Sequence, residues 1–125
     1  TDFTAKLIDV YPPNSWYPHG YALNLTDSIT RLRYRNGRSQ AEPLPPGELD
    51  EITIELYPTS NLFARGHRIR LDISSSNFPR FDVNPNTGEP IGRNRRQVAA
   101  DNTVFHDRLR ASHIVLPLIP PESDD

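Results

Sequence analysis

The sequence predicts an all-β fold, an antiparallel β-sandwich of jelly-roll or Greek-key kind. Three observations support this prediction. Short segments of alternating apolar and polar residues recur along the chain, proline and glycine turns separate them, and no segment of ten or more residues has helical apolar spacing. The length of 125 residues is typical of one compact domain.

The first half of the chain predicts three strands. Residues 2–10 alternate apolar side chains at positions 3, 5 and 7 with polar ones, and Pro12 and Pro13 end this strand. Residues 21–25 and 28–35 predict two further strands. The Asn36-Gly37 dipeptide favours a tight hairpin turn, so another strand is expected to return after it.

The second half contains the clearest alternation, at residues 50–57 and again at residues 67–73, where Ile69, Leu71 and Ile73 are expected to point inward. These two strands are expected to supply the middle of the core. Residues 74–88 are rich in turn-forming residues yet keep two phenylalanines, which predicts a long ordered loop. Residues 102–106 and 113–118 are the last two predicted strands.

The predicted domain covers residues 1–119, and residues 120–125 are expected to form a flexible tail. Because the sequence has no methionine, even at position 1, we expect it to be a piece of a longer polypeptide. The resemblance described below implies that this piece is the C-terminal portion.

Composition excludes several classes of function. The net charge of −2 gives no general attraction to nucleic acid, and no apolar run is long enough for a membrane helix. Since cysteine is absent, this chain has no disulfide framework and no thiolate nucleophile. We expect a soluble protein with neither a nucleic-acid nor a membrane partner, from the bacterial cytoplasm or secreted, and the sequence leaves the compartment open.

No catalytic, cofactor-binding or metal-ligating residue is predicted. The chain lacks the G-x-S-x-G motif of a hydrolase nucleophile, and His67 and Asp72 point to opposite faces of one predicted strand. Residues 82–86 begin like a calcium loop, but Thr87 and Arg93 stand where glycine and a bidentate acid are needed. The four histidines do not show zinc-site spacing.

Two groups of exposed side chains could bind a partner. Trp16, Tyr17 and Tyr21 lie in or beside a loop at one end of the predicted sandwich, where such aromatic residues either grip a sugar or cover the end of the domain. Arg33 and Arg35 share a face with Arg31, a stripe that either docks a carboxylate or an acidic partner or forms a solvated face.

The chain resembles the C-terminal β domain of the cocaine esterase and X-Pro dipeptidyl-peptidase hydrolases over nearly its whole length. The segments that carry the resemblance follow the family order: residues 2–12, 23–29, 31–35, 56–60, 66–71, 74–82, 84–88, 102–104 with His106, and 112–117. The stretch 16–20 lengthens the first connection relative to the family.

The resemblance implies a jelly-roll domain of the galactose-binding type without a catalytic role of its own. It also implies a partner, an N-terminal α/β-hydrolase domain of the same polypeptide that carries the Ser-Asp-His triad, and no cofactor. The parent enzyme would cleave esters, amides or X-Pro peptides, and whether it is a homo-oligomer stays open. The residues expected to contact the hydrolase domain or its cleft are Arg33, Arg35, Asn77, Phe78, Arg80, Phe81, Asp82 and Asn84. The alternative is a free-standing carbohydrate- or ligand-binding module that uses Trp16, Tyr17 and Tyr21.

Overall fold

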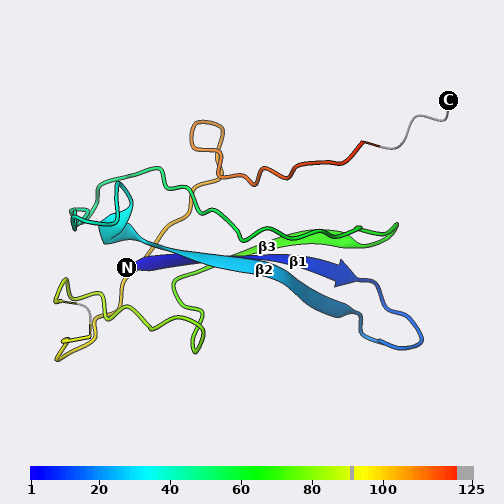
Figure 1. The fold of residues 1–125 in the computed structure, drawn as a ribbon, viewed down its shortest axis with the longest axis horizontal. Coiled ribbons are helices and arrows are strands. Elements are labelled where there is room, and N and C mark those ends of the chain that lie inside the picture. Colours follow the sequence, from blue (N-terminus) through cyan, green and yellow to red (C-terminus); the bar gives the residue numbers. More distant parts are fainter. Residues whose placement is uncertain (91, 121–125) are drawn as a thin grey trace.

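A three-stranded antiparallel sheet forms the centre of the molecule (Figure 1). The computed structural model describes residues 1–90 and 92–120. Strand β1 (Asp2–Tyr11) lies between β2 (Tyr21–Arg31) and β3 (Arg68–Ser74), and a 3-10 helix, η1 (Leu32–Tyr34), follows β2. The described residues contain no α-helix, so the prediction of a β fold without helices is confirmed for them.

Strand β1 is the most buried element because it has a hydrogen-bonded neighbour on each side. Its Ala5, Leu7 and Ile8 are the buried apolar residues of the described chain, each no more than 5% exposed. The prediction that residues 50–57 and 67–73 supply the middle of the core was therefore wrong. The core lies on β1, and β3 is an edge strand whose Ile69 and Ile73 stay exposed.

The register of β1 with its neighbours defines two faces of the sheet. Leu7 lies opposite Thr26 of β2 and Leu71 of β3, and residues 3, 5 and 9 share this side, which we call the Leu7 face. Residues 2, 4, 6 and 8 form the opposite side, the Thr4 face. One register shift occurs beside Leu7, where β2 carries the extra residue Leu25.

That shift explains why residues 21–31 form one strand, although the sequence predicted two. The bulge absorbs the change of alternation, and the chain then turns into η1 instead of continuing to residue 35. The hairpin predicted at Asn36-Gly37 is also wrong, because Gly37 donates to the carbonyl of Tyr34 in a helical-type turn and residues 38–67 contain no strand.

Each face of the sheet is covered by an irregular segment. The hydroxyls of Thr26 and Thr30 donate to the carbonyls of Tyr57 (2.9 Å) and Thr53 (3.3 Å), so residues 53–57 run antiparallel to β2 over the Leu7 face. They are extended without pairing as a strand, which corrects the strand predicted there. The loop after β3 lies on the other side of the sheet in Figure 1 and covers the Thr4 face.

The last two predicted strands are absent too. Residues 102–106 and 113–118 are not strands, and their region has one isolated bridge between His106 and Ala111. Residues 75–88 follow β3 and form a long ordered loop, as predicted for residues 74–88, although Ser74 itself ends the strand. The expected flexible tail at residues 120–125 falls, apart from Pro120, outside the described residues.

Candidate functional site

Three buried aspartates on the sheet attach the covering segments to the strands. Asp2, Asp9 and Asp27 are each no more than 3% exposed, although carboxylates are rarely buried unless they have partners. Each one accepts a hydrogen bond from an asparagine amide and lies beside an arginine or a histidine. The sheet therefore holds its loops by polar contacts more than by apolar packing.

Asp27 holds the loop that follows β3. Its Oδ2 accepts hydrogen bonds from the amides of Asn77 (3.1 Å) and Asn24 (3.3 Å), and its Oδ1 lies 2.9 Å from a guanidinium nitrogen of Arg80. The Oδ1 contact is an ion pair without hydrogen-bond geometry. Arg80 also approaches the rings of Tyr57 and Phe81. Two of the residues predicted as cleft contacts, Asn77 and Arg80, thus hold the domain together.

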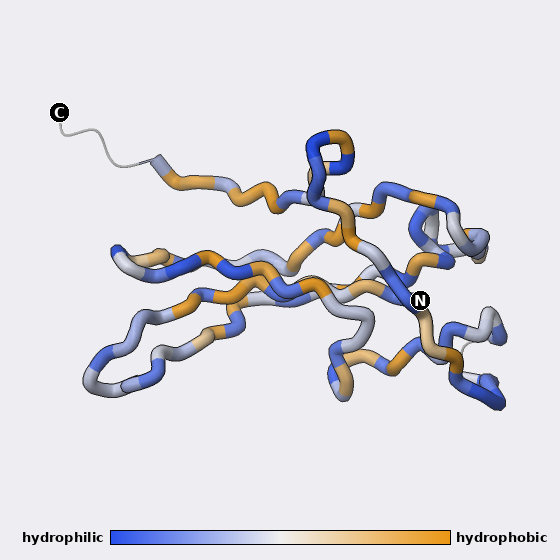
Figure 2. The backbone as a smooth tube through the Cα atoms, turned by 180° about the vertical axis from the view of Figure 1, so that it is seen from behind, coloured by the Kyte–Doolittle hydropathy of each residue, from blue (hydrophilic) through white to orange (hydrophobic). Residues whose placement is uncertain are grey.

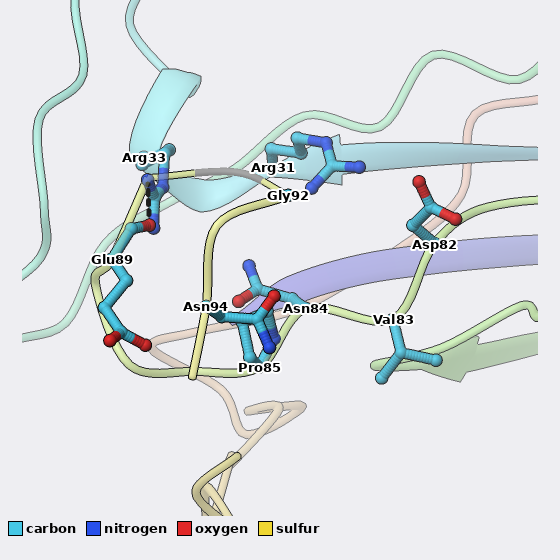
Figure 3. A pocket seen from close by; sticks show the side chains of 9 residues that line it. All are labelled: Arg31, Arg33, Asp82, Val83, Asn84, Pro85, Glu89, Gly92 and Asn94. Carbon is cyan, nitrogen blue, oxygen red and sulfur yellow. Dashed lines mark hydrogen bonds between the residues drawn. The ribbon is translucent and has the colours of Figure 1, made fainter. Parts of the chain in front are cut away.

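Asp2 holds the next part of the same loop. It accepts hydrogen bonds from Asn84 (2.8 Å) and Arg31 (3.1 Å). Beside this pair is a cavity of about 140 Å³ whose lining includes Arg33, Asp82 and Glu89 (Figure 3). Arg33 donates to the backbone carbonyl of Glu89 at 3.2 Å. Because two arginines and two acids line this cavity, it has no strong preference for an anion or a cation.

Asp9 forms the third site, on the Leu7 face. Its Oδ1 lies 2.8 Å from Nδ1 of His67 and its Oδ2 accepts a hydrogen bond from Asn61 at 3.2 Å. The ring of Tyr11 lies against His67, with 4.2 Å between ring centroids. A carboxylate that orients a histidine is also the geometry of a catalytic pair. Among the described residues, however, no hydroxyl or other nucleophile is hydrogen-bonded to His67, so this site anchors the segment 61–67 to β1.

The other predicted contact residues divide into bound and exposed ones. Arg35 is engaged with Asp50 and with the carbonyls of Leu32 and Glu42, and its side chain is 11% exposed. Phe78 is 69% exposed, Asp82 is exposed and Phe81 is half-buried. Of the eight predicted contact residues, Phe78, Arg80 and Asp82 are exposed, and the side chain of Arg80 is also held by Asp27.

The aromatic loop between β1 and β2 lies at one end of the sheet. Trp16 is 87% exposed, and the rings of Tyr17 and Tyr21 stack with 4.8 Å between centroids. Asn14 fixes the loop by accepting hydrogen bonds from the backbone amides of Trp16 and Tyr17. Gly20 closes it with a positive φ of 78°. The loop therefore presents one unpacked indole on a rigid turn.

Exposed apolar side chains are widespread on this molecule. They gather on β3, on the segment that precedes it, and on the extended residues 113–119, which are coloured largely as hydrophobic in Figure 2. Phe3, Ile73 and Val104 line an open hollow at the edge of the Leu7 face. The most exposed members outside the aromatic loop are Leu62 (86%), Leu109 (91%), Leu118 (88%) and Ile119 (91%). Extensive apolar exposure is typical of surfaces that bind a protein, a membrane or a ligand.

Sequence reasoning missed the buried aspartates. Asp2, Asp9 and Asp27 interrupt otherwise ordinary strand patterns and carry no motif. The sequence feature that could have indicated them is a set of loop asparagines at positions 61, 77 and 84. In the structure each of these asparagines donates a hydrogen bond to one of the three aspartates.

Neither a metal-binding cluster nor a membrane-spanning helix occurs in the described part of the chain. No group of three or more histidine, cysteine, aspartate or glutamate side chains there could hold a metal ion. None of its helices is long and apolar enough to cross a membrane.

The chain is similar to a part of several longer esterases. It is 44% identical over 121 residues to the cocaine esterase of Rhodococcus sp. (strain MB1 Bresler), a match that covers 95% of the chain and 20% of that esterase. It is 37% identical over 81 residues to two proteins provisionally named serine esterases, from Mycobacterium bovis and Mycobacterium tuberculosis. Those matches cover 65% of the chain and 11% of each relative. The chain thus spans about a fifth or less of the length of these relatives.

The family match covers most of the sequence. Residues 1–115 match the family described as the X-Pro dipeptidyl-peptidase C-terminal non-catalytic domain. The chain belongs to this family of non-catalytic C-terminal domains of X-Pro dipeptidyl-peptidase and cocaine esterase type hydrolases.

Proposed function

We propose that residues 1–119 form the C-terminal domain of a serine hydrolase and pack against an α/β-hydrolase domain of the same polypeptide. The exposed apolar surface carries this proposal. Among the described residues, three apolar ones are buried, whereas sixteen large apolar or aromatic side chains are exposed. Burying one such side chain contributes roughly 1.5–3 kcal/mol, so covering even a few of them would stabilise the domain substantially.

The part played by this domain is to support the catalytic domain and to wall its substrate cleft. The loop 77–84 suits that part because Asp27 and Asp2 fix both its ends while Phe78 and Asp82 are exposed. A rigid loop with an aromatic ring and a carboxylate at its surface can define the shape and charge of a cleft wall. The parent enzyme would act on esters or on X-Pro peptides, as the names of the relatives suggest.

Packing against the α/β-hydrolase domain would also favour the jelly-roll architecture of this domain. Residues 53–57 already lie over the Leu7 face, antiparallel to β2, as a second layer of a sandwich would. We propose that residues 1–119 complete a two-layered sandwich of galactose-binding type in the full-length enzyme.

Hydrogen exchange read by mass spectrometry tests the packing. The backbone of residues 113–119 should exchange quickly in the isolated chain and more slowly in the full-length polypeptide, because a docked surface loses access to water. The stretch 36–40, which is polar and mostly exposed, is the internal control and should exchange alike in both. Equal exchange of residues 113–119 in the two proteins would contradict docking.

The exposed Trp16 beside the stacked Tyr17 and Tyr21 favours a second candidate function, a ligand-binding loop. Titration of the isolated chain with a panel of oligosaccharides, followed by Trp16 fluorescence, tests it. A saturable change that is lost in a Tyr21→Ala variant would support ligand binding. A flat response would leave the supporting domain as the function.

A further inference from the structure

The dipeptide Asn36-Gly37 lies in an exposed turn that follows η1. It does not form the hairpin that the sequence predicted, and this turn makes no special demand for glycine at position 37. Gly37 is not among the glycines with a positive φ. Within residues 1–90 and 92–120, nothing lies within 4 Å of the point where a Cβ on Gly37 would stand, apart from its chain neighbours. The backbone nitrogen of Gly37 therefore has room to move.

We infer that Asn36 is a site of spontaneous deamidation and that its product opens the turn formed by residues 36–42. In the first step the backbone nitrogen of Gly37 attacks Cγ of Asn36. A bond from this nitrogen to Cγ forms, the bond from Cγ to Nδ2 breaks, and ammonia leaves with the proton of the Gly37 amide. Water then opens the five-membered imide at one of its two carbonyls, which gives aspartate or isoaspartate. Water is the one co-reactant.

The residue that follows an asparagine decides how readily this reaction occurs. The attacking nitrogen belongs to the next residue of the same chain, so the two reacting groups are always close together. Glycine has no Cβ to crowd the attack, and its backbone is the least restricted of all residues. Asn36 is followed by glycine, whereas every other asparagine of the chain is followed by a larger residue. The chemistry therefore singles out Asn36.

The hydrogen bonds around the dipeptide slow the reaction without preventing it. The amide of Gly37 donates to the carbonyl of Tyr34 at 3.2 Å, and Nδ2 of Asn36 donates to Oε2 of Glu42 at 2.7 Å. Asn36, Gly37 and Glu42 are all exposed. Exposed hydrogen bonds of this kind open often, because few buried contacts support them. Each opening frees the Gly37 nitrogen for attack.

Deamidation replaces an attraction by a repulsion. The amide of Asn36 donates to the carboxylate of Glu42, whereas an ionised carboxylate at position 36 can only accept hydrogen bonds. Two negative charges would then face each other across this contact, and like charges so close together repel. Arg35 is already engaged, because its guanidinium contacts Asp50 and the carbonyls of Leu32 and Glu42. The turn therefore loses the side-chain contact that closes it.

The isoaspartate product has a second effect, on the backbone. It lengthens the main chain by one carbon atom between positions 36 and 37, inside the turn that the hydrogen bond from Gly37 to Tyr34 closes. The amide of Glu42 donates to the carbonyl of Arg33 at 2.6 Å, so this second bond closes the wider loop. The amides of Gly37 and Glu42 consequently report whether the turn is open.

Ageing the longest natural polypeptide that contains these residues, at mildly alkaline pH and body temperature, tests the modification. Peptide mapping by mass spectrometry should show deamidation at Asn36, with both aspartate and isoaspartate products. Asn94 is the internal control, because it is also exposed but is followed by Arg95, and it should react about tenfold more slowly or less. Gly37→Ala should slow the reaction at Asn36 by about tenfold or more, and the open space at position 37 lets this variant fold.

Hydrogen exchange tests the consequence for the turn. In Asn36→Asp, the peptide that contains the amides of Gly37 and Glu42 should exchange several-fold faster than in wild type. Adding Glu42→Gln should restore slow exchange, since the glutamine amide can donate to the new carboxylate. Asn94→Asp is the matched control and should leave this peptide unchanged.

Two separate outcomes would overturn the inference. The modification is refuted if Asn36 reacts no faster than Asn94, or if Gly37→Ala reacts at the wild-type rate. The opening of the turn is refuted if Asn36→Asp exchanges like wild type, or if Glu42→Gln does not reverse its effect.

Discussion

Replacing His67 by phenylalanine tests whether buried carboxylates hold this domain together. The phenyl ring can keep the contact with Tyr11 but cannot donate to Asp9, whose side chain is 1% exposed. Asp9 would then keep one partner, the amide of Asn61 at 3.2 Å. An ionised carboxylate only accepts hydrogen bonds, so Nδ1 of His67 carries the hydrogen that is lost.

The expected cost follows from this geometry. A hydrogen bond to a charged group typically contributes about 1.5–3 kcal/mol, and leaving a buried acceptor without its partner costs about 1–3 kcal/mol. Since Asn61 remains and the His67 side chain is 12% exposed, we expect His67→Phe to lower the free energy of unfolding by about 2–3 kcal/mol. Water can reach part of the vacated site.

Urea unfolding followed by far-UV circular dichroism measures this cost. The variants are His67→Phe, Asp9→Leu and the double variant, analysed as a double-mutant cycle. The double variant should be more stable than His67→Phe alone, because it removes the stranded carboxylate. A loss below about 0.5 kcal/mol for His67→Phe, or additive effects in the cycle, would refute the role assigned to this pair.

Three further predictions follow from single features. The hydrogen bond from Arg70 holds the pKa of Asp72 below its ordinary value of 3.8. This pair should therefore contribute its full stability above about pH 4 and lose it as the pH falls through the lowered pKa, and Arg70→Gln should remove that part of the acid dependence in urea titrations from about pH 5 to about pH 2. Gly20→Ala should destabilise the domain by about 1–3 kcal/mol in thermal unfolding, because φ is 78° and the new Cβ would lie 2.7 Å from the carbonyl oxygen of Tyr11. Trp16→Ala should change the unfolding free energy by less than about 0.5 kcal/mol in the same assay, since its side chain is 87% exposed.

The sequence correctly predicted strands where the segment pairs with an adjacent strand of the sheet. It wrongly predicted strands where the segment has no such pairing. Residues 2–10 and 67–73 match β1 and β3 closely, because both segments pair with a neighbouring strand, although five of the seven residues of β3 are exposed. Residues 50–57 alternate just as clearly. They are extended and half-buried at Ile52, Ile54 and Leu56, yet they cross a face of the sheet and pair with no edge. The alternation of apolar and polar residues indicates which side chains point inward. It does not indicate which segment the backbone hydrogen-bonds to.

The candidate site shows the same limit. Arg33, Asn77, Arg80 and Asn84 were predicted as contacts for a partner from the family resemblance, and all four make polar contacts within this chain. Whether they also touch the catalytic domain stays a prediction. Their actual partners, such as Asp27, lie 50 or more positions away along the chain, and no local pattern connects residues so distant.

The three polar anchors also set how easily each covering segment can open. The side-chain hydrogen bonds that residues 61–67 form with the sheet all run to Asp9, and the ring of His67 also lies against Tyr11, so this segment has a single polar anchor. The loop 77–84 is fixed at Asp27 and at Asp2, so it is released when two separate anchors break together. Local opening should therefore be graded along the molecule, with the segment before β3 opening more often than the loop after it.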